Sequence, residues 1–129
     1  MLLGMATGLN HGICVQDLGI DNLTIADGLA VGRASGFVGK VMAPFMSGCY
    51  SMEDRRMYRM LTQIADTENL KLEPSALAGM YGPVVLAKLG DGYPGCLEHA
   101  TQLVWATGGS MVPPEEMQKY YEAGKRKGI

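Results

Sequence analysis

The stretch Leu103–Met117, LVWATGGSMVPPEEM, decides the fold that the sequence predicts. The apolar residues at its start, together with the preceding Gln102, form the run QLVWA at 102–106, which is typical of a strand covered on both faces. Thr107 ends the run, and Gly108 and Gly109 follow at once with no side chain to block an approach to the backbone. The same pattern is also typical of a plain strand-to-helix turn with a locally bonded hydroxyl, which is favoured on this stretch alone.

Helical periodicity recurs in the second half of the chain. The closing segment 113–128 opens with prolines and acids and ends with basic residues, as the helix dipole favours. Ser51 is a candidate cap for another helix that fades near 67–69, and Pro74 suits the first turn of a third. Pro83 should kink or divide that third helix. The helix capped by Ser51 has apolar residues at helical spacing: Met57, Met60, Leu61 and Ile64.

Short strands are predicted between the helices, at 22–26, 48–52, 70–73 and 102–106. Strands that alternate with helices imply right-handed crossovers and a mainly parallel sheet. We therefore expect an α/β fold in which residues 1–129 form a single segment. Ligands of such sheets bind outside the carboxyl ends of the strands. The candidate strand ends are Asp27-Gly28, Glu73-Pro74-Ser75 and Thr107-Gly108-Gly109.

The glycine-rich stretch Thr24–Gly36, TIADGLAVGRASG, predicts a turn at Asp27-Gly28 that leads to a helix at 37–46. Arg33 and Ser35 would suit a phosphate group. Their spacing matches neither a P-loop nor a dinucleotide-binding fingerprint, so the stretch is also consistent with a plain turn.

Composition argues against several classes of function. The 129 residues carry a formal net charge of -2, whereas surfaces for nucleic acids and anionic membranes need a basic excess. No apolar run approaches the roughly 20 residues that span a bilayer, and the apolar start lacks the basic segment of a signal peptide. Cys14, Cys49 and Cys96 are not at metal-ligand spacing from His11 or His99, and their odd number fits a reduced compartment. We expect a cytoplasmic protein without a metal site.

Each strand end has a plainer alternative to a binding site. Glu73 would lie where a strand leaves the sheet, but an acid, Pro74 and Ser75 are also usual residues at a helix start. No arrangement of serine, histidine and acid for nucleophilic catalysis is evident. Lys40 and Lys88 suit a helix surface better than a covalent link to a cofactor. The residues alone leave these alternatives open.

Three blocks, taken together and in order, resemble a known family. They are VQDLGIDNLTIADGLAVGRASGFVGKVM at 15–42, LEPSALAGM at 72–80 and LVWATGGSMVPPEEM at 103–117. They resemble the carboxyl-terminal part of bacterial D-serine dehydratases, also called D-serine ammonia-lyases, which are fold-type II pyridoxal-phosphate enzymes. The resemblance is loosest at 81–100. It implies a three-layer αβα fold with a mainly parallel sheet, of which this chain would be part of the large lobe, and conversion of D-serine to pyruvate and ammonia.

The resemblance also assigns cofactor-binding roles to residues of this chain. Thr107 would hold the pyridine nitrogen of pyridoxal phosphate with a neutral hydroxyl, which favours the protonated ring less than a carboxylate does. Gly108 and Gly109 would leave this edge of the ring unobstructed. Glu73 matches an acid near the ring, and Asp27-Gly28 match a turn whose backbone lies beside it.

Other functional parts of the family are expected outside this chain. Family members carry the lysine that links to the cofactor, the loop that binds the substrate carboxylate and the phosphate cradle earlier in their sequence. We therefore expect no catalytic residue here, and activity only with the missing amino-terminal part. One alternative is a non-catalytic αβ remnant that self-associates, and another is dehydration of L-serine or threonine. Methionine-rich faces would suit the remnant: Met42, Met46, Met57 and Met60.

Overall fold

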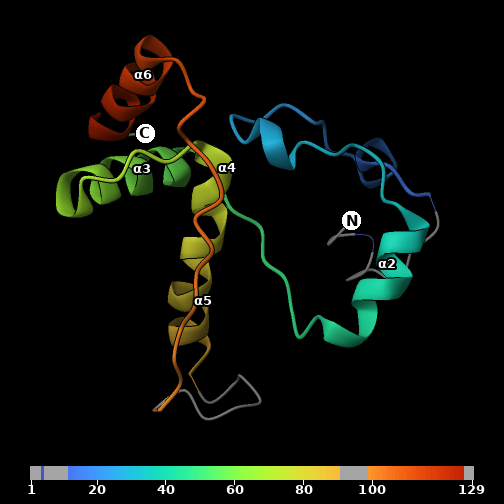
Figure 1. Ribbon diagram of the computed structural model, residues 1–129. Coiled ribbons are helices and arrows are strands. Elements are labelled where there is room, and N and C mark those ends of the chain that lie inside the picture. Colours follow the sequence, from blue (N-terminus) through green and yellow to red (C-terminus); the bar gives the residue numbers. More distant parts are fainter. Residues whose placement is uncertain (1–3, 5–11, 91–98, 127–129) are drawn as a thin grey trace. The chain divides into compact units, whose positions relative to one another are not determined.

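A computed structural model describes residue 4, residues 12–90 and residues 99–126 (Figure 1). The chain divides into two compact units, Met1–Ser51 and Met52–Ile129, which are described separately here. The expectation of a single segment over residues 1–129 stays a prediction. The stretch GDGYPG at 90–95, whose glycines and proline predict a loop, lies outside the described residues, apart from Gly90.

The helices predicted in the second unit are confirmed. The helix near 53–68 is present but begins after Glu53, so Ser51 is not its cap. The helix that begins at Pro74 continues as a 3-10 turn and is followed by a separate helix with Pro83 in its first turn, as a divided helix requires. The elements are α3 Asp54–Glu68, α4 Pro74–Leu77, η4 Ala78–Tyr81, α5 Gly82–Leu89 and α6 Pro114–Lys125.

The core of the second unit lies where α3, α4 and α6 meet. Leu61, Leu77 and Met117 are only 1%, 0% and 7% exposed, and each comes from a different one of these helices. Burial of each such side chain stabilises the fold by about 1.5–3 kcal/mol. Met57 is also buried and Met60 packs against the core, so both methionines contribute to the packing of the second unit. Self-association of the chain stays a prediction.

Helices α3 and α6 cross closely at Gly124. A Cβ atom at Gly124 would meet the Tyr58 carbonyl oxygen and the Thr62 hydroxyl, so only glycine fits there. The buried Thr62 hydroxyl donates a hydrogen bond to the Tyr121 carbonyl oxygen at 2.8 Å. The Tyr121 hydroxyl in turn donates to the Asp66 carboxylate at 2.6 Å. Together these contacts fix α6 on α3.

We expect Gly124→Ala to destabilise the second unit by about 1–2 kcal/mol. Overpacking costs about 1–3 kcal/mol, and the upper part of this range applies because the new Cβ would meet a backbone carbonyl oxygen. The better helix propensity of alanine recovers about 1 kcal/mol of that cost. Urea denaturation followed by circular dichroism measures the difference. Gly48→Ala is the control, because no heavy atom lies within 4 Å of its Cβ position. Stability of Gly124→Ala equal to that of the wild type would contradict the close crossing.

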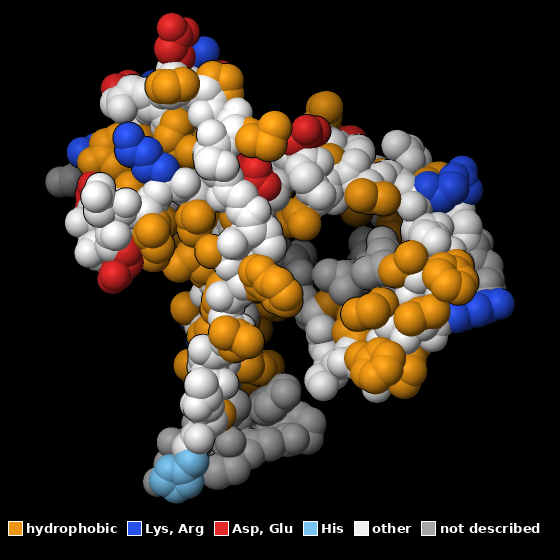
Figure 2. All heavy atoms as spheres, viewed as in Figure 1, with side chains coloured by type: hydrophobic (Ala, Val, Ile, Leu, Met, Phe, Trp, Pro, Cys, Tyr) orange, Lys and Arg blue, Asp and Glu red, His pale blue; other side chains and the backbone are white. Residues whose placement is uncertain are grey.

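The strand predictions are wrong for the chain as it stands. No strand occurs in the described ranges, and 22–26, 48–52, 70–73 and 102–106 have no ladder partner. A strand is defined by hydrogen bonds to a neighbour, which the apolar pattern of one segment does not supply. The run at 102–106 is also not covered on both faces, since Leu103 is 91% and Trp105 is 82% exposed. Figure 2 shows hydrophobic side chains along this extended segment, which runs beside α4 and α5.

The first unit contains the helix predicted at 37–46, as α2 Gly36–Met42 followed by η3 Ala43–Phe45. The Ser35 hydroxyl caps α2 by accepting the Val38 N–H at 3.3 Å. The predicted turn at Asp27-Gly28 is also present, as η2 Asp27–Leu29.

The first unit has another 3-10 turn, η1 Val15–Leu18, whose start is capped by the side chain of its own residue Asp17. Here the Cys14 backbone N–H donates to the Asp17 carboxylate at 2.9 Å and holds the pKa of Asp17 below its usual value. An isolated β-bridge joins Cys14 to Arg33.

Candidate functional site

Two of the three predicted strand ends meet in the second unit, at a place called here the Glu73–Gly108 junction, formed by residues 71–73 and 107–109. The Glu73 backbone N–H donates to the Gly108 carbonyl oxygen at 3.2 Å. Residues separated by more than thirty positions in the sequence are thereby placed side by side. The structure thus brings together Glu73 and Gly108, and Thr107 immediately precedes Gly108 in the chain.

The junction depends on both glycines. A Cβ atom at Gly108 would lie 2.7 Å from the Glu73 carboxyl carbon, so the carboxylate occupies the space that a side chain would need. Gly109 is buried with a φ of 140°, and its Cβ would meet the Lys71 carbonyl oxygen and lie 2.7 Å from the Leu72 Cα. The glycines therefore allow a close approach to the backbone, as the sequence predicts, but the group that approaches is another segment of this chain.

The side chains of the junction differ in exposure. Thr107 is exposed to solvent, whereas Glu73 is half-buried beside Gly108. Glu73 also precedes α4, and its carbonyl oxygen accepts the Ala76 N–H at 3.0 Å. An exposed neutral hydroxyl and a half-buried carboxylate can thus present one hydrogen-bonding group and one negative charge to a ligand at this edge.

The third predicted strand end lies in the other unit. Asp27 and Gly28 are exposed and begin the η2 turn, directly after the buried Ala26. The Asp27 carbonyl oxygen accepts the Ala30 N–H at 3.0 Å, which closes the turn locally. Their predicted position beside a cofactor ring stays a prediction.

A cavity of about 410 Å³ adjoins the junction. Lys71 and Gly109 belong both to its lining and to the junction, and Ser110 follows them. The remaining wall includes Asp66, whose carboxylate accepts the Tyr121 hydroxyl. The cavity gives a ligand at the junction access to both charged and apolar groups.

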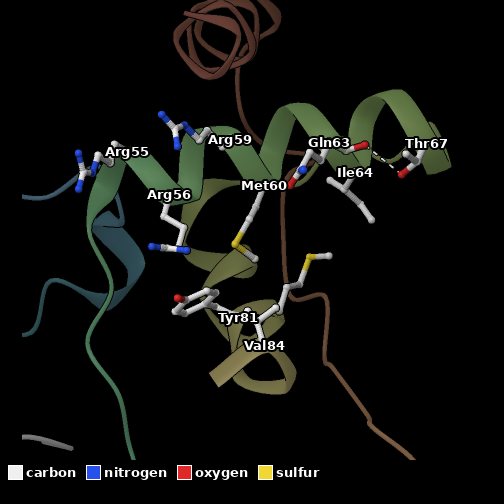
Figure 3. Close-up of a pocket in the computed structure, with 10 residues that line it drawn as sticks. Arg55, Arg56, Arg59, Met60, Gln63, Ile64, Thr67, Tyr81 and Val84 are labelled. Atoms are coloured by element: carbon white, nitrogen blue, oxygen red, sulfur yellow. Dashed lines mark hydrogen bonds between the residues drawn. The ribbon is translucent and has the colours of Figure 1, made fainter. Parts of the chain in front are cut away.

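A second hollow, called here the α3–α5 pocket, was not predicted from the sequence. It has a volume of about 570 Å³ and lies between α3, η4 and α5 (Figure 3). Arginines at 55, 56 and 59 are its most distinctive feature. Their clustering in the first half of α3 is the sequence signal that could have pointed to it. The pocket is lined by Arg55, Arg56, Arg59, Met60, Gln63, Ile64, Thr67, Met80, Tyr81 and Val84.

Two further properties concern only the residues that the structure describes. Among them, no three histidine, cysteine, aspartate or glutamate side chains gather in a way that could hold a metal ion. In the same part of the chain, no helix is long and apolar enough to cross a membrane.

Comparisons with known proteins extend the sequence resemblance. No family model matches the chain. Probable D-serine dehydratases from two strains of Bacillus cereus are 56% and 58% identical to it over 98% and 96% of its length. The corresponding protein of Bacillus mycoides is 55% identical over 96% of the chain. The chain spans only about 30% of the length of these curated relatives.

Proposed function

We propose that this chain, homologous to a portion of bacterial probable D-serine dehydratases, supplies the carboxyl-terminal part of a D-serine ammonia-lyase. The reaction would convert D-serine to pyruvate and ammonia with pyridoxal phosphate. The observation that carries the proposal is the Glu73–Gly108 junction. It brings side by side two of the sequence blocks that resemble the family, 72–80 and 103–117, at the residues expected to face the cofactor.

The residues of the junction fit one edge of the cofactor ring. The exposed Thr107 hydroxyl would contact the pyridine nitrogen, and the half-buried Glu73 carboxylate lies beside Gly108 of the same segment. When bound, pyridoxal phosphate supplies the electron sink for loss of the α-proton and the β-hydroxyl. The part of this chain is to orient the ring. A neutral hydroxyl does so without favouring the protonated ring nitrogen as a carboxylate would.

The rest of the enzyme would cover the exposed apolar segment of this chain. Leu103, Trp105 and Met111 are 91%, 82% and 94% exposed. Large exposed apolar side chains that gather in one segment mark an interaction surface. In the complete enzyme the extended segments at 70–73 and 102–106 would join neighbouring strands of a mainly parallel sheet in a three-layer αβα fold. The amino-terminal part would bring the lysine and the phosphate cradle.

Mixing experiments test this proposal. The chain is combined with pyridoxal phosphate and with the upstream part of the Bacillus cereus relative. The 2-oxo acid product is measured in each case, which is pyruvate from D-serine or L-serine and 2-oxobutanoate from L-threonine. We expect pyruvate from D-serine in the mixture and none from the chain alone. Preference for L-serine or L-threonine would instead favour the related activities.

Binding is followed separately through Trp105, the single tryptophan of the chain. The chain is labelled with 5-fluorotryptophan, and its fluorine NMR signal is recorded before and after the upstream part is added. We expect a shift, because the exposed indole would become covered. A shift without D-serine turnover would favour the alternative of a non-catalytic remnant. A shift with increasing concentration of the chain alone would show self-association through this segment.

A further inference from the structure

We propose that the α3–α5 pocket binds an organic phosphate, at a site separate from the Glu73–Gly108 junction. The arrangement that carries this inference is a cluster of arginines on α3 above an apolar floor. None of the residues that line the pocket belongs to the junction. The proposal therefore does not depend on the function proposed above.

The positive charge of the pocket is concentrated on the first half of α3. Arg55, Arg56 and Arg59 all lie among its lining residues, which include no aspartate or glutamate in the described part of the chain. The amino-terminal end of a helix already carries a partial positive charge, so basic residues there oppose the dipole and repel one another. An anion that enters the pocket is attracted by this concentration of positive charge.

The contacts of two arginines fix guanidinium groups near the pocket. Arg56 points from α3 toward α5, and its guanidinium carbon lies 4.3 Å from the centre of the Tyr81 ring (Figure 3). A guanidinium stacked on a ring keeps its N–H donors in the plane, where they can bind an oxyanion. Arg55 forms an ion pair with Glu53, which holds it at the start of α3. Arg59 is also among the lining residues, although its side chain points away from Tyr81 in Figure 3 and adds its charge at the edge of the pocket.

The floor of the pocket is apolar. Met60, Ile64 and Met80 line it and also pack against the buried core of the second unit. Gln63 and Thr67 extend the polar wall along α3, one and two turns beyond Arg59. The Thr67 hydroxyl donates to the Gln63 carbonyl oxygen at 2.9 Å and so can still accept a hydrogen bond.

The pocket chemistry selects the class of ligand. Several guanidinium groups without a carboxylate in the lining favour a dianion such as a phosphate monoester, which arginine binds through paired hydrogen bonds. A volume of about 570 Å³ is much larger than a phosphate group, and the apolar floor suits a hydrocarbon or aromatic body attached to it. An organic phosphate satisfies both requirements.

Calorimetric titration of the complete chain with three probes tests the phosphate group and the apolar body separately. The probes are phenyl phosphate, benzoate, which lacks the phosphate group, and inorganic phosphate, which lacks the apolar body. We expect phenyl phosphate to bind on the order of tenfold or more tightly than either other probe, since each lacks one of its two contacts. Binding of phenyl phosphate no tighter than that of inorganic phosphate would overturn the proposal. Backbone NMR shifts caused by phenyl phosphate should concentrate in 55–67 and 80–84, and shifts confined to other residues would also overturn it.

Substitutions of the arginines test whether they bind the phosphate group. Arg56→Gln combined with Arg59→Gln should weaken binding of phenyl phosphate on the order of tenfold or more. Arg126→Gln removes one positive charge outside the pocket and should leave the affinity nearly unchanged. Circular dichroism verifies that the helices of each variant are intact. Wild-type affinity in the folded double variant would contradict the proposal, and the NMR map of the wild-type chain tests it without any substitution.

Discussion

Gly109→Ala should destabilise the second unit by at least about 2 kcal/mol and separate the two segments of the Glu73–Gly108 junction. A φ of 140° is a conformation that residues with a side chain rarely adopt, and adopting it costs about 1–3 kcal/mol. The new methyl group would also meet the backbone of Lys71 and Leu72, and such overpacking costs about 1–3 kcal/mol more. Backbone atoms cannot move aside as the end of a flexible side chain can.

Urea denaturation followed by circular dichroism measures this effect. Circular dichroism is the suitable signal because the single tryptophan, Trp105, is already exposed in the folded chain. Gly90→Ala is the matched control, since Gly90 also has a positive φ of 51° but no heavy atom within 4 Å of its Cβ position. It measures the backbone strain alone. If the two variants lose the same stability, the close contact at Gly109 is refuted.

Thr107→Asp should reduce turnover of D-serine by about a hundredfold or more in the enzyme reconstituted from this chain and the upstream part. Displacement of a group at the reacting centre by even 1 Å costs on the order of a hundredfold in rate. A carboxylate at this position would also favour protonation of the pyridine nitrogen, which a neutral hydroxyl does not. The absorption spectrum of the bound cofactor should change together with the rate.

Thr107→Ser is the matched control, because it keeps the hydroxyl and loses only a methyl group. Its turnover and cofactor spectrum should remain close to those of the wild type. Thr107 is exposed in this chain, so neither substitution should affect helix content measured by circular dichroism. Wild-type turnover and an unchanged spectrum in Thr107→Asp would exclude Thr107 as the partner of the ring nitrogen.

The helices were predictable because their signals are local. Met57, Leu61 and Ile64 recur at the spacing of one helix face, and Pro74 and Pro114 stand in first turns, as expected. The strands could not be predicted in this way, because strand pairing requires a neighbouring segment that a local pattern does not specify. In the described residues, the run at 102–106 has neither a ladder partner nor a cover for Trp105.

The candidate site was predictable in part for a related reason. The rule that ligands bind at strand ends selected Glu73 and Thr107, and the structure places their segments side by side even without a sheet. The close backbone contact at Gly109 depends on a positive φ and on a distant segment, so the glycine pattern alone could not specify it. The α3–α5 pocket was missed because arginines on a helix are usually solvated, and Tyr81 approaches Arg56 only in the folded chain.

An activity titration tests the central claim most directly. The upstream part of the Bacillus cereus relative is held at a fixed concentration with pyridoxal phosphate and D-serine, and the rate of pyruvate formation is measured as this chain is added. The account predicts no pyruvate when this chain is left out. As the chain is added, the rate should rise and reach a plateau at a molar ratio of one chain to one upstream part, because one chain completes one site. Full activity of the upstream part alone, or no pyruvate from a mixture in which the fluorine signal of Trp105 shows binding, would contradict it.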